Sequence, residues 1–293
     1  MQVAIFGQWL QHLQRRTTLD RPLLLLNLDE TCMRFPEKPR VGLVASKARG
    51  WTSHAGAKLL RRGSATFVAV LCENEAVQKC LPSFVLCNKH LCPKKLYEDL
   101  LAAAPPSLCI WRLASSWNTS VVMCEILEVL AAALRPWQQF CQPTLTMDLA
   151  PCHITQSVLQ KARSLQLFIA CVPTGLTPQL QVADVFCFRA FKAFFAGELQ
   201  KLRAEGHEVT KALFFQIFFK VPAWLQARSW AKAFQAICAL DGNINLLTKD
   251  LQALGLHPTV QDSLPTQSQI ASLWPRQRCT SKTYSLLFTR NLE

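Results

Sequence analysis

The sequence predicts a mixed α/β domain in which helices pack against a central β-sheet. Three observations predict this class. Five short apolar segments have the length and composition of buried strands. Several longer segments repeat apolar residues every three or four positions, as amphipathic helices do. The strand-like segments come first along the chain and then alternate with helical ones, an order typical of a sheet flanked by helices.

The strand predictions begin with "LLLLNL" at residues 23–28. Five leucines in six positions predict a strand that is buried on both faces and stops at Asp29 and Glu30. Four more segments have strand character because they combine apolar, β-branched and aromatic residues. They are "SATFVAVLCE", "PSFVLC", "PTLTMD" and "LQLFIACV", at residues 64–73, 82–87, 143–148 and 165–172.

Helices are predicted between and after these strands. Residues 118–136 begin with polar capping residues, repeat apolar residues at helical spacing and stop at Pro136. Shorter helices are expected at 156–164 and 229–240, and residues 211–224 read as a buried or interface helix. All of these helices carry an apolar face that the sheet or a neighbouring helix would cover.

The longest predicted helix spans residues 180–203. One stripe of this helix holds residues at spacings of three and four, so we expect its phenylalanines to belong to the core. The same spacing predicts that Asp184 faces inward near the start of the helix. The stripe consists of Asp184, Phe188, Phe191, Phe195, Leu199 and Leu202.

Length and composition indicate one globular domain with appendages. The chain has 293 residues, of which 50% are hydrophobic and 17% charged, a composition that excludes a disordered protein. We expect a short lead-in at residues 1–20, a domain at 21–242 and a loosely ordered tail at 243–293. No apolar run reaches the roughly 18 residues needed to cross a bilayer, so no membrane partner is expected.

The charge and the cysteines narrow the class further. Lys and Arg total 32 against 19 Asp and Glu, and a net charge of +13 favours a polyanionic partner, nucleic acid before membrane. An ordinary basic surface is the alternative reading. Thirteen scattered cysteines without a secretory signal predict reduced thiols in an intracellular protein. Cys87, His90 and Cys92 lack the second ligand pair of a zinc finger, so structural zinc is disfavoured.

Three aspartates occupy positions suited to metal chemistry. Asp29 and Asp148 follow predicted strands, and Asp184 starts the long helix. If the strands are neighbours and the helix crosses them, three carboxylates meet at one edge of the sheet, where like charges need compensation. Two Mg²⁺ or Mn²⁺ ions supply it and support phosphodiester cleavage. Taken singly, each aspartate is more simply a turn or cap residue.

Three sequence boxes give the same aspartates a family context. "NLDET", "TMDLAPCH" and "PTGLTPQLQVADVFCFRAFK" together resemble the DDE-type transposases of the mariner-like and pogo-like superfamily. Weaker likenesses fall in order between and after the boxes, so that the resemblance covers about residues 21–242. The boxes carry Asp29, Asp148 and Asp184 at the positions of the family's metal-binding aspartates.

The resemblance implies a ribonuclease H-like fold, with a mixed five-stranded sheet flanked by helices. It also implies metal-dependent DNA strand cleavage and transfer, DNA as the partner, a possible homodimer, a nuclear location and no small-molecule cofactor. Asp29, Asp148 and Asp184 would be the catalytic metal ligands. Glu30 and His153 would support the metal site or touch DNA, although His153 also reads as a plain histidine at a helix start.

The basic segment 38–62 contains no Asp or Glu and follows the first aspartate strand. We expect it to lie near the active edge and to hold DNA phosphates without sequence preference. Its tryptophan could stack on a base or simply anchor a loop. A solvated loop is the alternative reading of the whole segment. The candidate DNA-binding residues are Lys47, Arg49, Trp51, Lys58, Arg61 and Arg62.

Several positions depart from the family pattern. Leu149 follows the second aspartate where the family usually has Asn, and Cys32 stands where Gly is common. Only about 20 residues precede the first strand, so the family's helix-turn-helix module is absent or lies outside this chain. A catalytically silent transposase remnant that binds DNA or protein therefore stays open as the alternative function. An unrelated ribonuclease H-like nuclease is a third reading.

Overall fold

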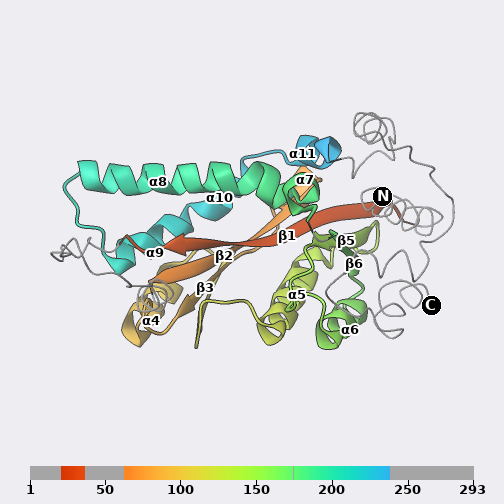
Figure 1. Cartoon of the computed structure of the whole chain (residues 1–293), viewed down its shortest axis with the longest axis horizontal. Coiled ribbons are helices and arrows are strands. Elements are labelled where there is room, and N and C mark those ends of the chain that lie inside the picture. Colours follow the sequence, from red (N-terminus) through yellow and green to blue (C-terminus); the bar gives the residue numbers. More distant parts are fainter. Residues whose placement is uncertain (1–20, 37–62, 174, 238–293) are drawn as a thin grey trace, which may run out of the picture.

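The computed structural model describes residues 21–36, 63–173 and 175–237. These residues form a six-stranded mixed sheet in the order β4-β3-β2-β1-β5-β6 (Figure 1). β2 pairs antiparallel with β1 and with β3. The other pairs, β1 with β5, β5 with β6 and β3 with β4, are parallel. The strands are β1 Leu23–Arg34, β2 Ser64–Cys72, β3 Ser83–Asn88, β4 Leu108–Leu113, β5 Gln142–Met147 and β6 Phe168–Cys171.

Helices cover both faces of this sheet. In Figure 1, α8, α9 and α10 lie on one face, and α5 and α6 on the other. The predicted class, a mixed α/β sheet flanked by helices, is confirmed, with six strands rather than the expected five. The helices are α3 Glu75–Gln78, α4 Lys94–Ala103, α5 Ser120–Leu134, α6 Gln156–Ser164, α7 Thr177–Leu180, α8 Phe188–Ala204, α9 Lys211–Phe219, α10 Val221–Gln226 and α11 Ala231–Ala236, with a π-helical turn, η1, at Ala183–Cys187.

Two strand predictions need correction. β4 was not expected, because its short, half-exposed sequence becomes a strand only through parallel pairing with β3. The end of β1 at Asp29 and Glu30 was also wrong. β1 continues to Arg34 because its antiparallel pairing with β2 runs on to the Arg34–Ser64 pair. On its other side, however, the pairing of β1 with β5 stops at Asn27.

The long helix differs from its prediction at the start. α7 and the turn η1 precede α8, so the chain does not run as one regular helix from residue 180. A π-helical turn closes i→i+5 hydrogen bonds and shifts the register of the residues before it. Asp184, within this turn, is therefore exposed rather than on the inward face.

The core between α8 and the sheet is aromatic. Phe188, Phe191 and Phe195 are buried, as predicted, and Phe191 stacks on Phe67 of β2 with ring centroids 4.4 Å apart. Phe218 of α9 packs 4.9 Å from Phe195. The predicted buried helix at 211–224 is thus present as α9 and α10. In the described part of the chain, no helix is long and apolar enough to cross a membrane.

Candidate functional site

Asp29 and Asp148 stand level on neighbouring strands. β1 and β5 run parallel, and Asn27 pairs with Thr146 at the last register position. Each aspartate is two residues beyond this pair. The two side chains therefore point to the same face of the sheet, at the same position along the strands. Asp29 remains within β1, whereas Asp148 directly follows β5. The sheet register therefore brings two acids together that are far apart in sequence.

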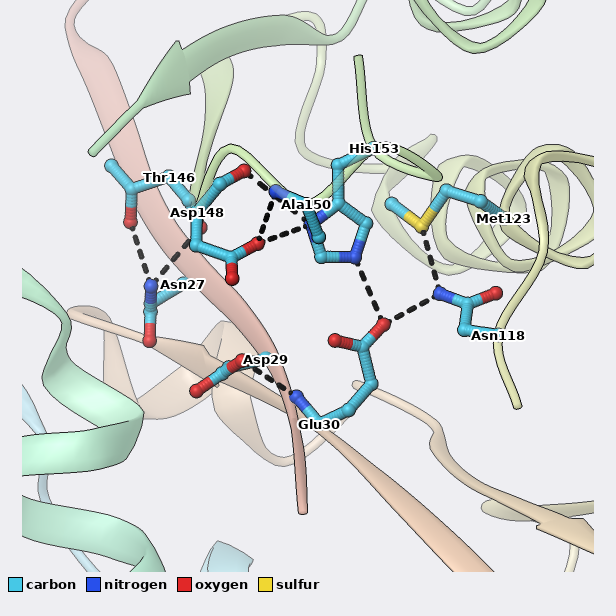
Figure 2. Close-up of polar contacts among 9 residues, drawn as sticks. All are labelled: Asn27, Asp29, Glu30, Asn118, Met123, Thr146, Asp148, Ala150 and His153. Carbon is cyan, nitrogen blue, oxygen red and sulfur yellow. Dashed lines mark hydrogen bonds and ion pairs between the residues drawn. The ribbon is translucent and has the colours of Figure 1, made fainter. Parts of the chain in front are cut away.

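Asn27 connects the three elements that carry the three aspartates. Its buried amide donates from Nδ2 to the Thr146 carbonyl at 3.0 Å and to Thr146 Oγ1 at 3.1 Å (Figure 2). Its Oδ1 accepts the backbone N–H of Ala183 at 2.8 Å. One side chain thus fixes β5 and η1 against β1, next to Asp148 and Asp184.

Asp29 is the most buried of the three acids, with 6% of its surface exposed. Its Oδ1 accepts the backbone N–H of Glu30 at 2.8 Å. Burial raises its pKa to about 8, and the negative charge of Asp184 contributes next, with smaller contributions from Glu30 and Asp148. At neutral pH this carboxyl therefore keeps its proton unless a cation approaches.

Asp184 contacts Asp29 from the other side. Its pKa is raised by partial burial and by the charge of Asp148, while Lys192 and a hydrogen bond from Asp29 act in the opposite direction. The charges of Asp184 and Asp148 raise the pKa of Asp29, and the charge of Asp148 raises that of Asp184, so the three predicted aspartates lie near one another.

Asp148 is engaged by a histidine. Nδ1 of His153 lies 2.7 Å from Asp148 Oδ1, which also accepts the backbone N–H of Ala150 at 3.0 Å (Figure 2). Nε2 of the same imidazole lies 2.9 Å from Glu30 Oε1. The Glu30 oxygen also accepts Nδ2 of Asn118 at 2.5 Å. Glu30, His153 and Asp148 therefore form a continuous chain beside the cleft.

The charges in this chain follow from its contacts. Burial alone would lower the pKa of His153, but its hydrogen bonds to Asp148, Cys152 and Glu30 raise it far above its ordinary value. The imidazole is therefore protonated and donates from both nitrogens. Burial would raise the pKa of Asp148, yet the hydrogen bond and charge of His153 hold it below its ordinary value. With 0% exposure, His153 has no surface that could touch DNA.

These side chains line a cleft of about 590 Å³. The cleft reaches from the acids to the far end of β1, where it meets an exposed arginine and the start of β2. Asp184 is not among its lining residues. The lining comprises Asp29, Glu30, Cys32, Arg34, Ser64, Thr66, Ser116, Trp117, Asn118, Asp148, Ala150 and Cys152.

The structure does not describe the remaining predicted site residues. The candidate DNA-binding residues Lys47, Arg49, Trp51, Lys58, Arg61 and Arg62 fall outside the described residues. Sequence reasoning assigned no role to Asn27, Arg34 or Trp117, and used Asn118 only as a helix cap. The available signal was weak: Asn27 belongs to the "NLDET" box, and the others carry no distinguishing pattern.

The three acids have the right chemistry to bind a divalent cation, but their present positions do not form a metal site. All three offer carboxylate oxygens, which Mg²⁺ and Mn²⁺ prefer. The pKa of Asp29 is raised first by burial and then by the charge of Asp184, and a bound cation would offset both. Yet among the described residues no three His, Cys, Asp or Glu side chains are grouped so as to hold a metal ion. Binding an ion therefore requires the acids to move closer together. Cys87, His90 and Cys92, which are among these described residues, form no such group either.

Fold and cleft together define a mixed α/β domain with a carboxylate-lined cleft at the sheet edge. No protein-family model matches the chain, and no curated protein does. Among solved structures, the chain is similar to the catalytic domain of the Mos1 mariner transposase. The sequence identity is 14% and the TM-score 0.37, over 79% of this chain and 93% of that domain.

Two Mos1 complexes show the same level of similarity. They are the paired-end complex with the left transposon end, at 13% identity and a TM-score of 0.36, and the paired-end complex with Mn, at 14% and 0.35. The match covers 79% of this chain and 62% of the Mos1 chain in each, so this chain spans less than two thirds of it. Chains this different need not share an activity, so the function has to follow from the side chains themselves.

Proposed function

We propose that this protein is a DDE-type nuclease domain that cleaves and transfers DNA strands with two Mg²⁺ or Mn²⁺ ions. One observation carries the proposal: Asp29, Asp148 and Asp184 come from three elements fixed together by Asn27, and the charges of Asp184 and Asp148 contribute to the raised pKa of Asp29. Repulsion on a buried acid such as Asp29 is costly for a purely structural site and useful for a cation site.

Each residue has a defined task in this proposal. The ions, when bound, act as Lewis acids on the phosphodiester, and Asp29, Asp148 and Asp184 would hold them. His153 binds Oδ1 of Asp148, so the second oxygen of that carboxylate stays available for the cleft. Glu30 binds the other nitrogen of the imidazole and fixes its orientation, and Asn118 in turn donates to Glu30.

DNA would reach the cleft through basic groups. Arg34 lines the cleft and the chain carries a net charge of +13, which favours binding to a phosphate backbone. Arg34, the last residue of β1, and Ser64, the first of β2, pair with each other and both line the cleft, and segment 38–62 lies between them in the sequence. We therefore expect Lys47, Arg49, Lys58, Arg61 and Arg62 to contact phosphates. A homodimer and a nuclear location complete the expected setting.

Plasmid nicking by the purified chain tests the proposal. Supercoiled DNA should be nicked with Mg²⁺ or Mn²⁺ and stay intact with EDTA. Asp148→Asn should lower the nicking rate by roughly 100-fold or more, because a ligand carboxylate is lost. Asp99→Asn, an exposed aspartate of α4 that does not line the cleft, is the matched control and should cleave normally. Equal nicking by the parent and Asp148→Asn would place the chemistry elsewhere.

A catalytically silent DNA-binding remnant is the second candidate function. The observation that favours it is the protonated His153, which already neutralises Asp148 without any metal. Leu149, beside this aspartate, also packs partly buried against the core, where the related family has a polar Asn. In that case the chain would bind DNA with normal salt dependence and show no metal-dependent nicking.

A further inference from the structure

Trp117 is the large exposed aromatic residue of the cleft. It lines the cleft together with Asp29 and Arg34, yet 63% of its surface faces solvent. A tryptophan buries more apolar area than most residues when it is covered, so an exposed indole beside a binding cleft offers a large contact surface. A single exposed apolar residue elsewhere on a surface would need no such explanation.

The backbone on both sides of Trp117 is held in place. Ser116 is buried, and Asn118 donates to Glu30 Oε1 at 2.5 Å and to Met123 Sδ at 3.6 Å. Thr119 then caps α5 by accepting the backbone N–H of Val122 at 3.3 Å. The indole is thus mounted on a fixed segment at the mouth of the cleft, which lowers the entropy lost when a ligand covers it.

The other groups of the cleft indicate which ligand would cover the ring. Arg34 provides a positive charge for a phosphate, and Asp29, Glu30 and Asp148 line the same cleft. At about 590 Å³ the cleft falls within the range of small-ligand sites, and a nucleotide of a DNA strand fits that range. A flat indole stacks on a base only when the base is unstacked from its duplex neighbour.

We propose that Trp117 stacks on an unpaired nucleobase next to the phosphodiester held in the cleft. This inference rests on the proposed function and adds a preference: the substrate strand enters the cleft single-stranded or with a flipped base. Because every base has a π-face, the contact favours unpaired over paired DNA without selecting a sequence.

Binding of fluorescein-labelled oligothymidylate, followed by anisotropy in EDTA, tests the inference without any cleavage. Trp117→Ala should weaken binding at least about fivefold, and Trp117→Phe should restore most of it, because base stacking on an aromatic ring contributes that much. Phe140→Ala removes another exposed aromatic, 65% exposed and outside the cleft, and should bind normally. Unchanged binding by Trp117→Ala would overturn the inference.

An oligonucleotide of abasic sites tests the stacking contact on the parent chain alone, without relying on a variant that has to fold. The parent chain should bind it at least about fivefold more weakly than oligothymidylate, whereas Trp117→Ala should bind both alike. Equal binding of both strands by the parent chain would refute the stacking contact. Plasmid nicking separates the two proposals. If the parent nicks plasmid DNA but Trp117→Ala binds oligothymidylate as well as the parent does, only this inference is refuted. If Trp117→Ala weakens that binding but the parent does not nick DNA, only the proposed nuclease is refuted.

Discussion

The backbone N–H of Ala183 donates to Oδ1 of Asn27 at 2.8 Å, which ties the turn carrying Asp184 to the strand carrying Asp29. The same Asn27 side chain holds Thr146, two residues before Asp148. Because the amide is buried, none of its contacts can be replaced by solvent without cost. Asn27 therefore sets the distances among the three acids.

Asn27→Ala is expected to lower both stability and activity. The variant leaves the Ala183 N–H without its acceptor, which should cost about 2–3 kcal/mol in urea unfolding, and it should reduce nicking because the acids lose their alignment. Asn74→Ala is the control. It removes the cap of α3, which should cost about 1 kcal/mol and leave nicking unchanged. If both variants nick equally, Asn27 has no role in aligning the acids.

His153→Ala should destabilise the fold, because it leaves the Glu30 and Asp148 carboxylates beside each other without the cation between them. Removing one partner from a largely buried ionic group should cost roughly 2–3 kcal/mol in urea unfolding. His207→Ala is the matched control. Its Nε2 lies 3.8 Å from Glu205 with both side chains exposed, so its loss should change stability by less than about 0.5 kcal/mol. Similar losses for the two histidines would contradict the assigned charges.

Glu198→Gln is expected to make stability less dependent on acid pH. Glu198 is a buried residue of α8 whose hydrogen bonds from Lys201, at 2.6 Å, and from Lys220 hold its pKa below the ordinary 4.5. A lowered pKa contributes stability that is present above pH 4.5 and is lost as the pH falls through the folded value.

Both lysines are largely exposed, so the contribution at pH 7 should be only about 1 kcal/mol. Urea unfolding at several pH values should show the parent chain more stable than Glu198→Gln at pH 7, with the gap closing below pH 4.5. Glu125→Gln, at an exposed position of α5, should match the parent at every pH. A gap that persists at low pH would show that the lysines do not act through the carboxylate charge.

Most of the sheet followed from local composition. Leu24, Leu25 and Leu26 are buried on both sides of β1, as a run of leucines predicts. The edge strand β4 did not follow, because half-exposed residues such as Trp111 gain strand structure only from pairing with β3. The end of β1 was misjudged for a related reason: pairing with β2, not local sequence, extends the strand to Arg34.

Sequence reasoning led to two acids that line the cleft but not to the contacts that connect them. Sequence order and residue type led to Asp29 and Asp148, since both follow apolar segments. The inward position of Asp184 was wrong, because helical spacing does not indicate where a π-helical turn interrupts the register. The contact of His153 with Glu30 joins residues 123 positions apart, and only the folded sheet brings such residues together.

Binding of Mn²⁺ to the chain, followed by loss of the electron paramagnetic resonance signal of the free ion, tests the central claim most directly. We expect about two ions to bind each parent chain, as in two-metal nucleases, and the variant with Asp29→Asn and Asp148→Asn to bind none at the same concentration. Asp99→Asn should bind as the parent does. Equal Mn²⁺ binding by the parent and the double variant, or no binding by either, would contradict the claim that these acids form a metal site.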